Sequence, residues 1–251
     1  MIEPSLKIFF MSNFLIFGAN SPMVEDLIFD INKNENDKLF LFVNNLDKFK
    51  NGLGQKLDMN NVELFCCDLL SNKVFELIDK INVKIDSFCY VSGSTHLSLI
   101  KFLKRDDISN VFEVNFFKPL FITQYLLKKK LVALNANFVY VSSISGVNSV
   151  APGILSYSSS KAALNNLVKV LTLECKSLNI KFNTICPGIV QTDFNKDIDK
   201  VKAKNEDLLL TRYPLGYGIP SDISSLIKYL LTENTWLTGQ NISIDGGFTI
   251  N

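Results

Sequence analysis

The sequence predicts an α/β fold in which a doubly wound parallel sheet of about seven strands carries helices on both of its faces. Short apolar runs alternate with longer helical patterns, and this rhythm persists to the end of the chain. The runs are continuously apolar, which is typical of strands buried on both faces, whereas a half-exposed strand alternates apolar and polar residues. Hydrophobic residues make up 47% of the 251 positions, which is enough to cover such a sheet.

Each element is expected at one apolar run or one helical pattern. The expected strands are residues 14–17, 39–43, 62–67, 85–91, 137–142, 180–185 and 241–244. The expected helices between them are residues 22–32, 72–81, 108–130, 156–177 and 221–232. Because strand–helix–strand units close with a right-handed crossover, this repetition predicts a parallel sheet.

The chain is predicted to form one domain, because no Pro-, Gly- or Ser-rich linker and no internal repeat divides it. We expect this domain to cover residues 11–251, since Met11 stands just before the first strand pattern. Residues 1–10 are interpreted as an N-terminal appendage. A charged segment at residues 193–211 interrupts the rhythm between two strands and is interpreted as a substrate lid.

Composition and charge argue against several classes of function. With 26 basic and 25 acidic residues the net charge is +1, which leaves no electrostatic footprint for nucleic acid. No apolar run approaches the roughly 18 residues that span a bilayer, and the first ten residues do not resemble a signal peptide. The 5 cysteines include no C-x-x-C pair and the one histidine, His96, stands alone. We therefore expect free thiols, a cytoplasmic location and no bound metal.

Tyr157 and Lys161 carry the clearest chemical signal. They stand four positions apart at the start of a predicted helix, so their side chains share one face. A phenol with a pKa near about 10 is a poor acid–base catalyst at neutral pH, and a neighbouring ammonium lowers that pKa. Ser143, at the end of a predicted strand, could bind a substrate oxygen. The spacing alone also suits a different interpretation, a helix N-terminus with serine caps and a polar surface.

Further short motifs follow one another from about residue 14 to residue 248. They are Gly18-Ala19-Asn20-Ser21, Asp68-Leu69, Gly93, Val114-Asn115, Ser142 to Gly146, Tyr157 with Lys161, Asn183 to Thr192, Pro214-Leu215-Gly216, Thr238-Gly239-Gln240 and Asp245-Gly246-Gly247. In content and order this set resembles the short-chain dehydrogenase/reductase family, particularly its single-domain members related to 3-oxoacyl-[acyl carrier protein] reductases.

The resemblance implies a role for each catalytic position. Tyr157 would be the general acid in reduction and the general base in oxidation. Lys161 would lower the pKa of Tyr157 and hold the nicotinamide ribose. Ser143 would orient the substrate oxygen, and Asn115 would hold a water in a proton relay to Lys161.

The resemblance also implies a dinucleotide cofactor. Asp68 would meet the adenine ring and Thr192 the carboxamide. The whole implied cofactor set is Gly18, Asn20, Ser21, Asn44, Asp68, Leu69, Gly93, Tyr157, Lys161, Pro187, Gly188, Val190 and Thr192. An acidic residue at the end of the second strand would favour NAD and an arginine NADP, but this chain has Asn44 there, with Lys48 nearby, so the choice stays open.

Three departures from the family pattern bear on the site. The first loop usually reads T-G-x-x-x-G-x-G, but Pro22 and Val24 replace the second and third glycines. Pro22 suits the first helical position with Ser21 as N-cap, whereas the branched Val24 needs room against the sheet, so we expect a weakened or reshaped cofactor site. The loop after the fourth strand lacks the family's asparagines and continues to His96, interpreted as a solvated loop residue or as a substrate contact. The third departure is one extra position between Ser143 and Tyr157.

The expected function is NAD(P)(H)-dependent interconversion of a carbonyl and a secondary alcohol. A 3-oxoacyl-thioester-like or other ketone is one substrate class, and lysines 128–130 could dock an acidic carrier or simply suit a helix C-terminus. A polar sugar-type ketone or polyol is another. A binding or scaffold protein with a degraded cofactor site is the alternative from a different class. The resemblance further implies a homo-tetramer or homo-dimer that pairs through helices 108–130 and 156–177.

Overall fold

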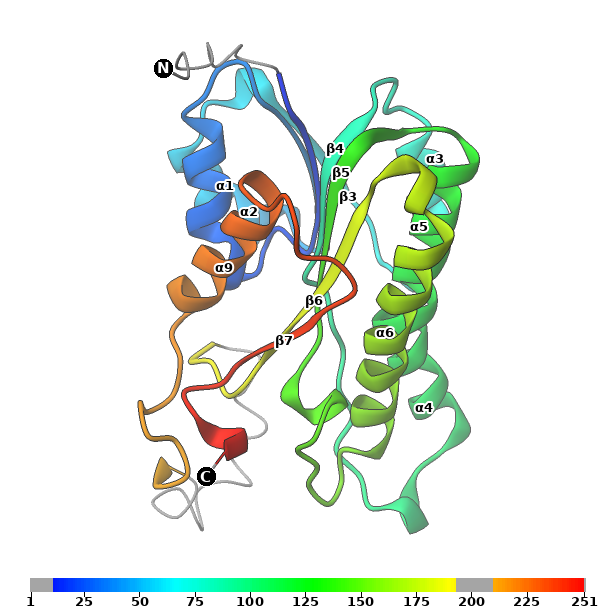
Figure 1. Ribbon diagram of the computed structural model, residues 1–251, viewed down its shortest axis with the longest axis vertical. Coiled ribbons are helices and arrows are strands. Elements are labelled where there is room, and N and C mark those ends of the chain that lie inside the picture. The colour runs from blue at the N-terminus through cyan, green and yellow to red at the C-terminus, as the bar shows by residue number, and fades with distance from the viewer. Residues whose placement is uncertain (1–10, 193–209, 251) are drawn as a thin grey trace, which may run out of the picture.

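Strands of one parallel sheet run through the middle of the molecule (Figure 1). The computed structural model describes residues 11–192 and 210–250. Within these residues the strands are β1 (Asn13–Phe17), β2 (Lys38–Val43), β3 (Val62–Cys66), β4 (Ile85–Tyr90), β5 (Val132–Val141), β6 (Lys181–Pro187) and β7 (Asn241–Ile244). Their order in the sheet is β3-β2-β1-β4-β5-β6-β7, and every neighbouring pair is parallel. The predicted doubly wound sheet is thereby confirmed.

The strand order reverses at β1. The chain builds β2 and β3 outward on one side and then returns to place β4 on the other side of β1. At such a switch point the two flanking loops leave the sheet in opposite directions, so a crevice opens at the carboxyl ends of the strands.

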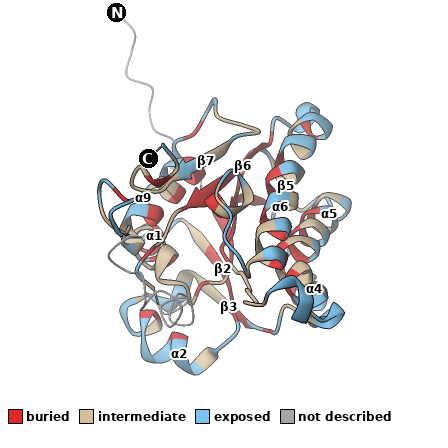
Figure 2. Cartoon of the chain, turned by 90° about the horizontal axis from the view of Figure 1, so that it is seen from below, coloured by how far each residue is buried: buried red, intermediate tan, exposed pale blue. Residues whose placement is uncertain are grey.

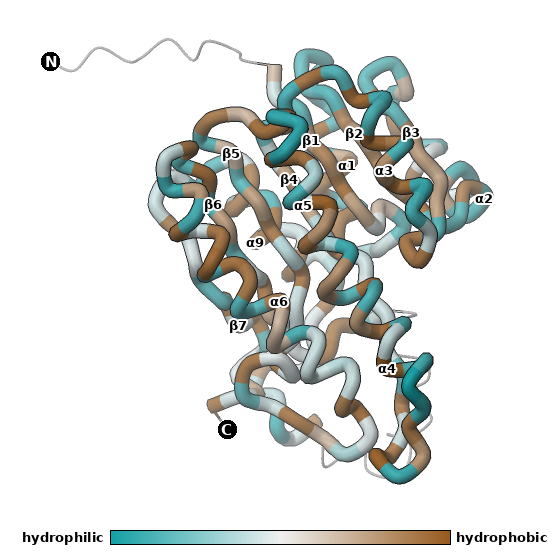
Figure 3. Tube along the Cα trace, turned by 90° about the vertical axis from the view of Figure 1, so that its right-hand side faces the viewer, coloured by the Kyte–Doolittle hydropathy of each residue, from teal (hydrophilic) through white to brown (hydrophobic). Residues whose placement is uncertain are grey.

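Helices cover both faces. In Figure 1, α1 (Glu25–Asn32), α2 (Leu46–Asn51) and α9 (Pro220–Thr232) lie to the left of the sheet. To its right lie α3 (Lys73–Ile78), α4 (Arg105–Phe112), α5 (Lys118–Lys128) and α6 (Leu155–Glu174), and Figure 3 views this second layer from outside. In the part of the chain described, no helix is long and apolar enough to cross a membrane.

Two hydrophobic cores lie between the sheet and its helical layers. Alternate residues of a strand point to opposite faces, and β1 shows this directly. Leu15 and Phe17 belong to one core, whereas Phe14 and Ile16 belong to the other. Figure 2 shows the buried residues in the strands and on the helix sides that face them. Both faces of the strands are covered, which explains why their sequences are apolar throughout.

The predicted strands are all present, with shifted bounds. β5 begins at Val132, earlier than predicted, and passes through Asn135, whose φ of 63° marks an irregular start. The short helix α2 and several 3-10 turns were not predicted. Six residues are too few for a clear helical period, so α2 left no pattern to detect.

The predicted helices are present with informative differences. The helix predicted at residues 108–130 is formed by α4, which begins at Arg105, a π-helical segment at Glu113–Phe117 and α5. Residues 22–32 open with a 3-10 turn at Pro22–Val24, so α1 starts at Glu25. The proposed lid at 193–211 falls largely outside the described residues, as does the proposed appendage at 1–10.

Candidate functional site

A cavity of about 1290 Å³ opens at the carboxyl ends of the strands. Its wall contains the residues that end or follow six of them, from Gly18 after β1 to Pro187 at the end of β6. This is the switch-point crevice that the strand order predicts. All the residues predicted to bind a cofactor line it, including Asn44 and Asp68 at one end and Tyr157 and Lys161 towards the other.

The loop after β1 fits tightly between strands. Gly18 has a φ of +87°, a conformation that favours glycine, and a Cβ on it would lie 2.7 Å from the hydroxyl oxygen of Ser92. The N–H groups of Gly18 and Ala19 both donate to the carbonyl oxygen of Phe42 in β2. Glycine at position 18 therefore allows the loop after β1 to pass close to Val91 and Ser92, which follow β4.

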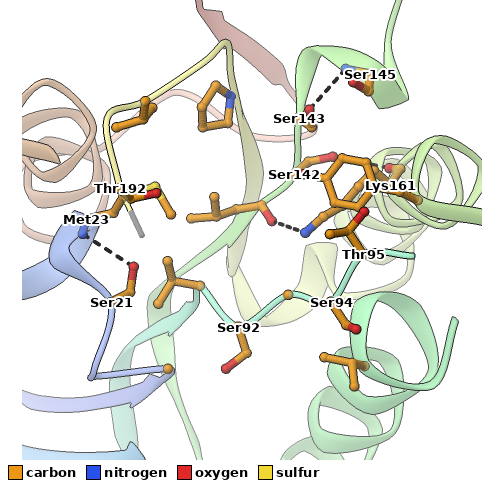
Figure 4. A pocket seen from close by; sticks show the side chains of 18 of the residues that line it. Ser21, Met23, Ser92, Ser94, Thr95, Ser142, Ser143, Ser145, Lys161 and Thr192 are labelled. Carbon is orange, nitrogen blue, oxygen red and sulfur yellow. Dashed lines mark hydrogen bonds between the residues drawn. The ribbon is translucent and has the colours of Figure 1, made fainter. Parts of the chain in front are cut away.

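The same loop uses most of its backbone donors internally. Ser21 N–H donates to Gly18 O, Val24 N–H to Ser21 O, and Glu25 N–H to Pro22 O, while Pro22 has no N–H. Met23 N–H donates to the Ser21 hydroxyl oxygen at 3.3 Å (Figure 4). A phosphate oxygen could replace this long bond, and the freed Ser21 hydroxyl could then donate as well, so the loop still fits an anion.

Val24 does not disturb the cavity. Its side chain is fully buried, belongs to the same core as Leu27, Ile28 of α1 and Ile223 of α9, and does not line the cavity. The close approach that a third glycine would allow is replaced here by a packed valine, and the 3-10 turn delays the start of α1. Val24 thus finds its room in the core, and the expected weakening or reshaping of the cofactor site stays a prediction.

Lys161 is held in place by the end of β5. Its ammonium Nζ donates to Val141 O at 2.8 Å and lies 5.8 Å from the centroid of the Tyr157 ring. Ser142 Oγ also donates to Lys161 O, at 3.2 Å. Gly146 permits this docking, because a Cβ there would lie 2.6 Å from the Lys161 carbonyl carbon. The serine-rich loop and the helix start therefore form one packed unit.

Burial acts on both titratable groups of this unit. It lowers the pKa of Lys161 from 10.5 to about 8. It also raises the pKa of Tyr157 above its ordinary 10.0, while the Ser143 hydroxyl opposes that rise. The pKa of Tyr157 thus moves in the direction opposite to the lowering that the spacing predicts, because burial outweighs the hydrogen bond with Ser143.

Ser143 and Asn115 occupy different depths. Ser143 lines the cavity, and its Oγ accepts from Ser145 N–H at 3.1 Å (Figure 4). Asn115 is fully buried in the π-helical segment behind the cavity wall. Its amide Nδ2 donates to Ser94 O and Ser160 Oγ, both at 2.9 Å, and its Oδ1 accepts from Ser94 N–H at 2.8 Å. Asn115 therefore braces the loop after β4, where the family's asparagines are missing.

His96 lies off the cavity. Thr95 and Leu97 line it, but His96 does not, and its imidazole is partly exposed 3.5 Å from a carboxylate oxygen of Asp107. This placement favours the interpretation of His96 as a solvated loop residue.

Several cavity residues were not predicted. Leu97, Ser98 and Leu99 after β4 contribute to the wall, as do Arg212, Tyr213 and Phe248 near the C-terminal end. The motif Pro214-Leu215-Gly216 follows Tyr213, and the motif Asp245-Gly246-Gly247 precedes Phe248, so both could have directed attention to these residues.

The chain is similar to known proteins over most of its length. Residues 55–249 match the family model described as "Enoyl-(Acyl carrier protein) reductase". The 3-oxoacyl-[acyl-carrier-protein] reductase of Thermotoga maritima is 30% identical over 210 residues, covering 83% of this chain and 83% of that protein. Among solved structures, 4-hydroxyisoleucine dehydrogenase complexed with NADH has a TM-score of 0.84 at 25% identity, covering 96% of this chain and 99% of the other. ElxO with NADP bound has a TM-score of 0.82 at 25% identity, covering 96% and 100%.

Proposed function

The chain belongs to the short-chain dehydrogenase/reductase family, and from this premise we propose that it is an NAD(P)-dependent oxidoreductase that interconverts a carbonyl and a secondary alcohol. The observation that carries the proposal is the single continuous cavity. It joins Asn44 and Asp68 at the ends of β2 and β3 to Tyr157, Lys161 and Ser143. A dinucleotide needs such a length of cavity to bring its reactive end to a proton donor.

The residues of the cavity fit a dinucleotide. Asn44 and Asp68 would hold the adenosine end, and Ser21 with the Met23 N–H would hold the phosphates. Lys161 would hold the nicotinamide ribose and Thr192 the carboxamide. The bound nicotinamide supplies the hydride, and the protein supplies position and a proton.

In reduction, the Ser143 hydroxyl donates a hydrogen bond to the substrate carbonyl oxygen. The Tyr157 hydroxyl gives its proton to that oxygen as the carbonyl carbon is reduced, and the Lys161 ammonium stabilises the resulting phenolate. In oxidation the phenolate takes the proton back. The raised pKa of Tyr157 keeps the phenol protonated at neutral pH, which suits its role as the acid in reduction.

For the substrate we propose a ketone of the 3-oxoacyl-thioester type or a related one. The relative from Thermotoga maritima is a 3-oxoacyl-[acyl-carrier-protein] reductase, and apolar side chains such as Leu97, Leu99 and Ile154 line the cavity. Ser98, Ser145 and Ser149 line the same cavity, and their hydroxyl groups keep a polar sugar-type ketone as the second substrate class.

A titration of the purified protein with NADH and with NADPH, followed by fluorescence and calorimetry, tests the proposal. Saturable binding of either nucleotide is expected. Gly18→Val is the matched variant, because its side chain would collide with Ser92 and disturb the loop; circular dichroism checks that the variant folds. If neither nucleotide binds to the folded wild-type protein even at millimolar concentration, the proposal fails and the protein is a non-catalytic binding or scaffold relative.

A further inference from the structure

Arg212 lies at the substrate end of the cavity and has no assigned role. Its guanidinium carbon lies 4.2 Å from the centroid of the Phe248 ring, within the range of a cation–π contact. Arg212 is exposed and lines the cavity together with Phe248. An arginine that stacks on an aromatic ring can still donate hydrogen bonds through the N–H groups at the edge of its plane.

The Phe248 ring that Arg212 contacts is firmly packed at the substrate end of the cavity. Phe248 is buried, and its ring centroid lies 4.6 Å from that of Tyr213. Both rings belong to one cluster with Ile144, the residue that follows Ser143. Tyr213 is itself fixed, because its hydroxyl oxygen accepts from Ile189 N–H at 3.1 Å. Packing therefore connects Arg212 to the residue that orients the substrate oxygen.

At the substrate end of the cavity, the described lining residues carry positive charge without a matching negative charge. Among the described residues that line the cavity the acidic one is Asp68, which lies at the opposite, adenosine end, whereas Lys161 and Arg212 lie at this end. Asp245 is near Tyr213, but its two carboxylate oxygens accept from Gly247 N–H and Thr249 N–H. Over residues 11–192 and 210–250 no carboxylate forms an ion pair with Arg212.

We propose that Arg212 binds an anionic group of the substrate, so that this enzyme acts on ketones that carry a carboxylate or a phosphate. The proposal rests on the proposed function and narrows its substrate class. A planar guanidinium with a fixed face binds such oxygens with two parallel hydrogen bonds. Among the described residues no carboxylate pairs with Arg212, and a neutral polyol would supply none, so the arrangement favours an acidic ketone over a sugar.

Two matched pairs of probes test the proposal and distinguish the two anions. Acetoacetate and methyl acetoacetate differ in a carboxylate. Acetoacetyl-4′-phosphopantetheine and the neutral thioester acetoacetyl-pantetheine differ in one phosphate. Each ketone is reduced by the wild-type protein and by Arg212→Gln, with kcat and KM measured separately and at two salt concentrations.

In the wild-type protein the charged member of one pair is expected to have the lower KM. Arg212→Gln should raise that KM by about 10- to 100-fold, the effect of losing a charge-assisted hydrogen bond, with little change in kcat. The neutral members should be nearly unaffected, and Arg212→Lys should restore part of the loss. The pair that responds identifies the anion as carboxylate or phosphate.

Lys101→Gln is the matched control. Lys101 also lies over a phenyl ring, 4.8 Å from the centroid of Phe102, but does not line the cavity. This variant removes the same charge and should leave both pairs unchanged. Turnover by Arg212→Gln with an undiminished preference for the charged probes would overturn the proposal while leaving the proposed function intact. Absence of turnover of all four ketones, with normal nucleotide binding, would overturn the substrate class alone.

Discussion

The Lys161 ammonium donates a hydrogen bond of 2.8 Å to the carbonyl oxygen of Val141, the last residue of β5. This bond joins the first turns of α6 to the strand that leads into Ser143. The bond also holds the ammonium in a buried position, and only 3% of the Lys161 surface is exposed. The position that would serve proton transfer is thus one in which a charge is costly.

Replacing Lys161 with methionine should stabilise the protein at neutral pH while abolishing turnover. Burial lowers the pKa of Lys161 from 10.5 to about 8, so the unfolded chain binds this proton more tightly than the folded chain. Above pH 10.5 the amine is neutral in both states, so it does not lower the free energy of unfolding. As the pH falls from 10.5 towards about 8 the unfolded chain takes up the proton first, and the free energy of unfolding decreases. The loss below that pH is about 3 kcal/mol. Because Lys161→Met also removes the bond to Val141, we expect a net gain of about 1–2 kcal/mol at pH 7 in chemical denaturation. A variant less stable than the wild type at pH 7 would contradict this account.

The rate of carbonyl reduction should fall above pH 8. Tyr157, whose pKa is raised, stays protonated in this range, whereas Lys161 loses its charge near pH 8. A neutral amine no longer stabilises the phenolate, so kcat/KM for reduction should show one descending limb with a midpoint near that pH. The measurement is a profile of kcat/KM from about pH 6 to about pH 10. A rate that stays constant through about pH 9.5 would show that the charge of Lys161 is not needed.

Replacing Tyr157 with phenylalanine should lower turnover by about 100-fold or more. The ring stays and the proton donor is lost, so nucleotide binding measured by fluorescence should be nearly unchanged. Tyr229→Phe is the control, since Tyr229 is exposed on α9 and does not line the cavity. Undiminished turnover in Tyr157→Phe would remove Tyr157 from the mechanism.

The sequence predicted those parts of the fold whose signal is local. Phe14 to Phe17 are apolar because both faces of β1 are covered, so the run itself marks the strand. The π-helical segment around Asn115 could not be predicted, because the helical pattern continues through it and only the packing of the loop after β4 shows its position.

The site shows the same division between local and tertiary signals. The spacing of Tyr157 and Lys161 predicted that they share a helix face, but their pKa values depend on burial, which arises from the docking of Gly146 against α6. Arg212 and Phe248 are 36 positions apart in the sequence, so their contact left no pattern.

The exposed rings at the start of α5 should form a contact between copies of the chain. Phe117 and Phe121 are 39% and 42% exposed, and their rings stack with centroids 6.2 Å apart. Two partly exposed rings side by side form an apolar surface patch, and such a patch favours burial against another copy of the chain. We expect a homo-dimer or homo-tetramer by light scattering, and Phe121→Glu should shift it towards smaller species because the charge would be desolvated. Phe29→Glu on α1, with a similar exposure of 39%, is the control. A wild-type monomer would contradict the prediction.

Restoring the family's third glycine should weaken the fold without improving the cofactor site. The Val24 side chain is fully buried in the core between α1 and α9 and does not line the cavity. Val24→Gly removes that buried surface and adds backbone freedom to the unfolded chain, so the free energy of unfolding should fall by about 2–4 kcal/mol. Nucleotide affinity should be unchanged once the variant is folded, because the donors that face the cavity come from Ser21 and Met23.

Val170→Gly separates the two contributions to this loss. Val170 lies in α6 with 43% of its surface exposed, so its replacement costs mainly backbone freedom, about 1 kcal/mol. The larger loss in Val24→Gly then measures the buried side chain. A gain in nucleotide affinity of tenfold or more in Val24→Gly would show that the valine, despite facing the core, holds the loop away from the phosphates, and that the 3-10 turn at Pro22–Val24 is what weakens binding.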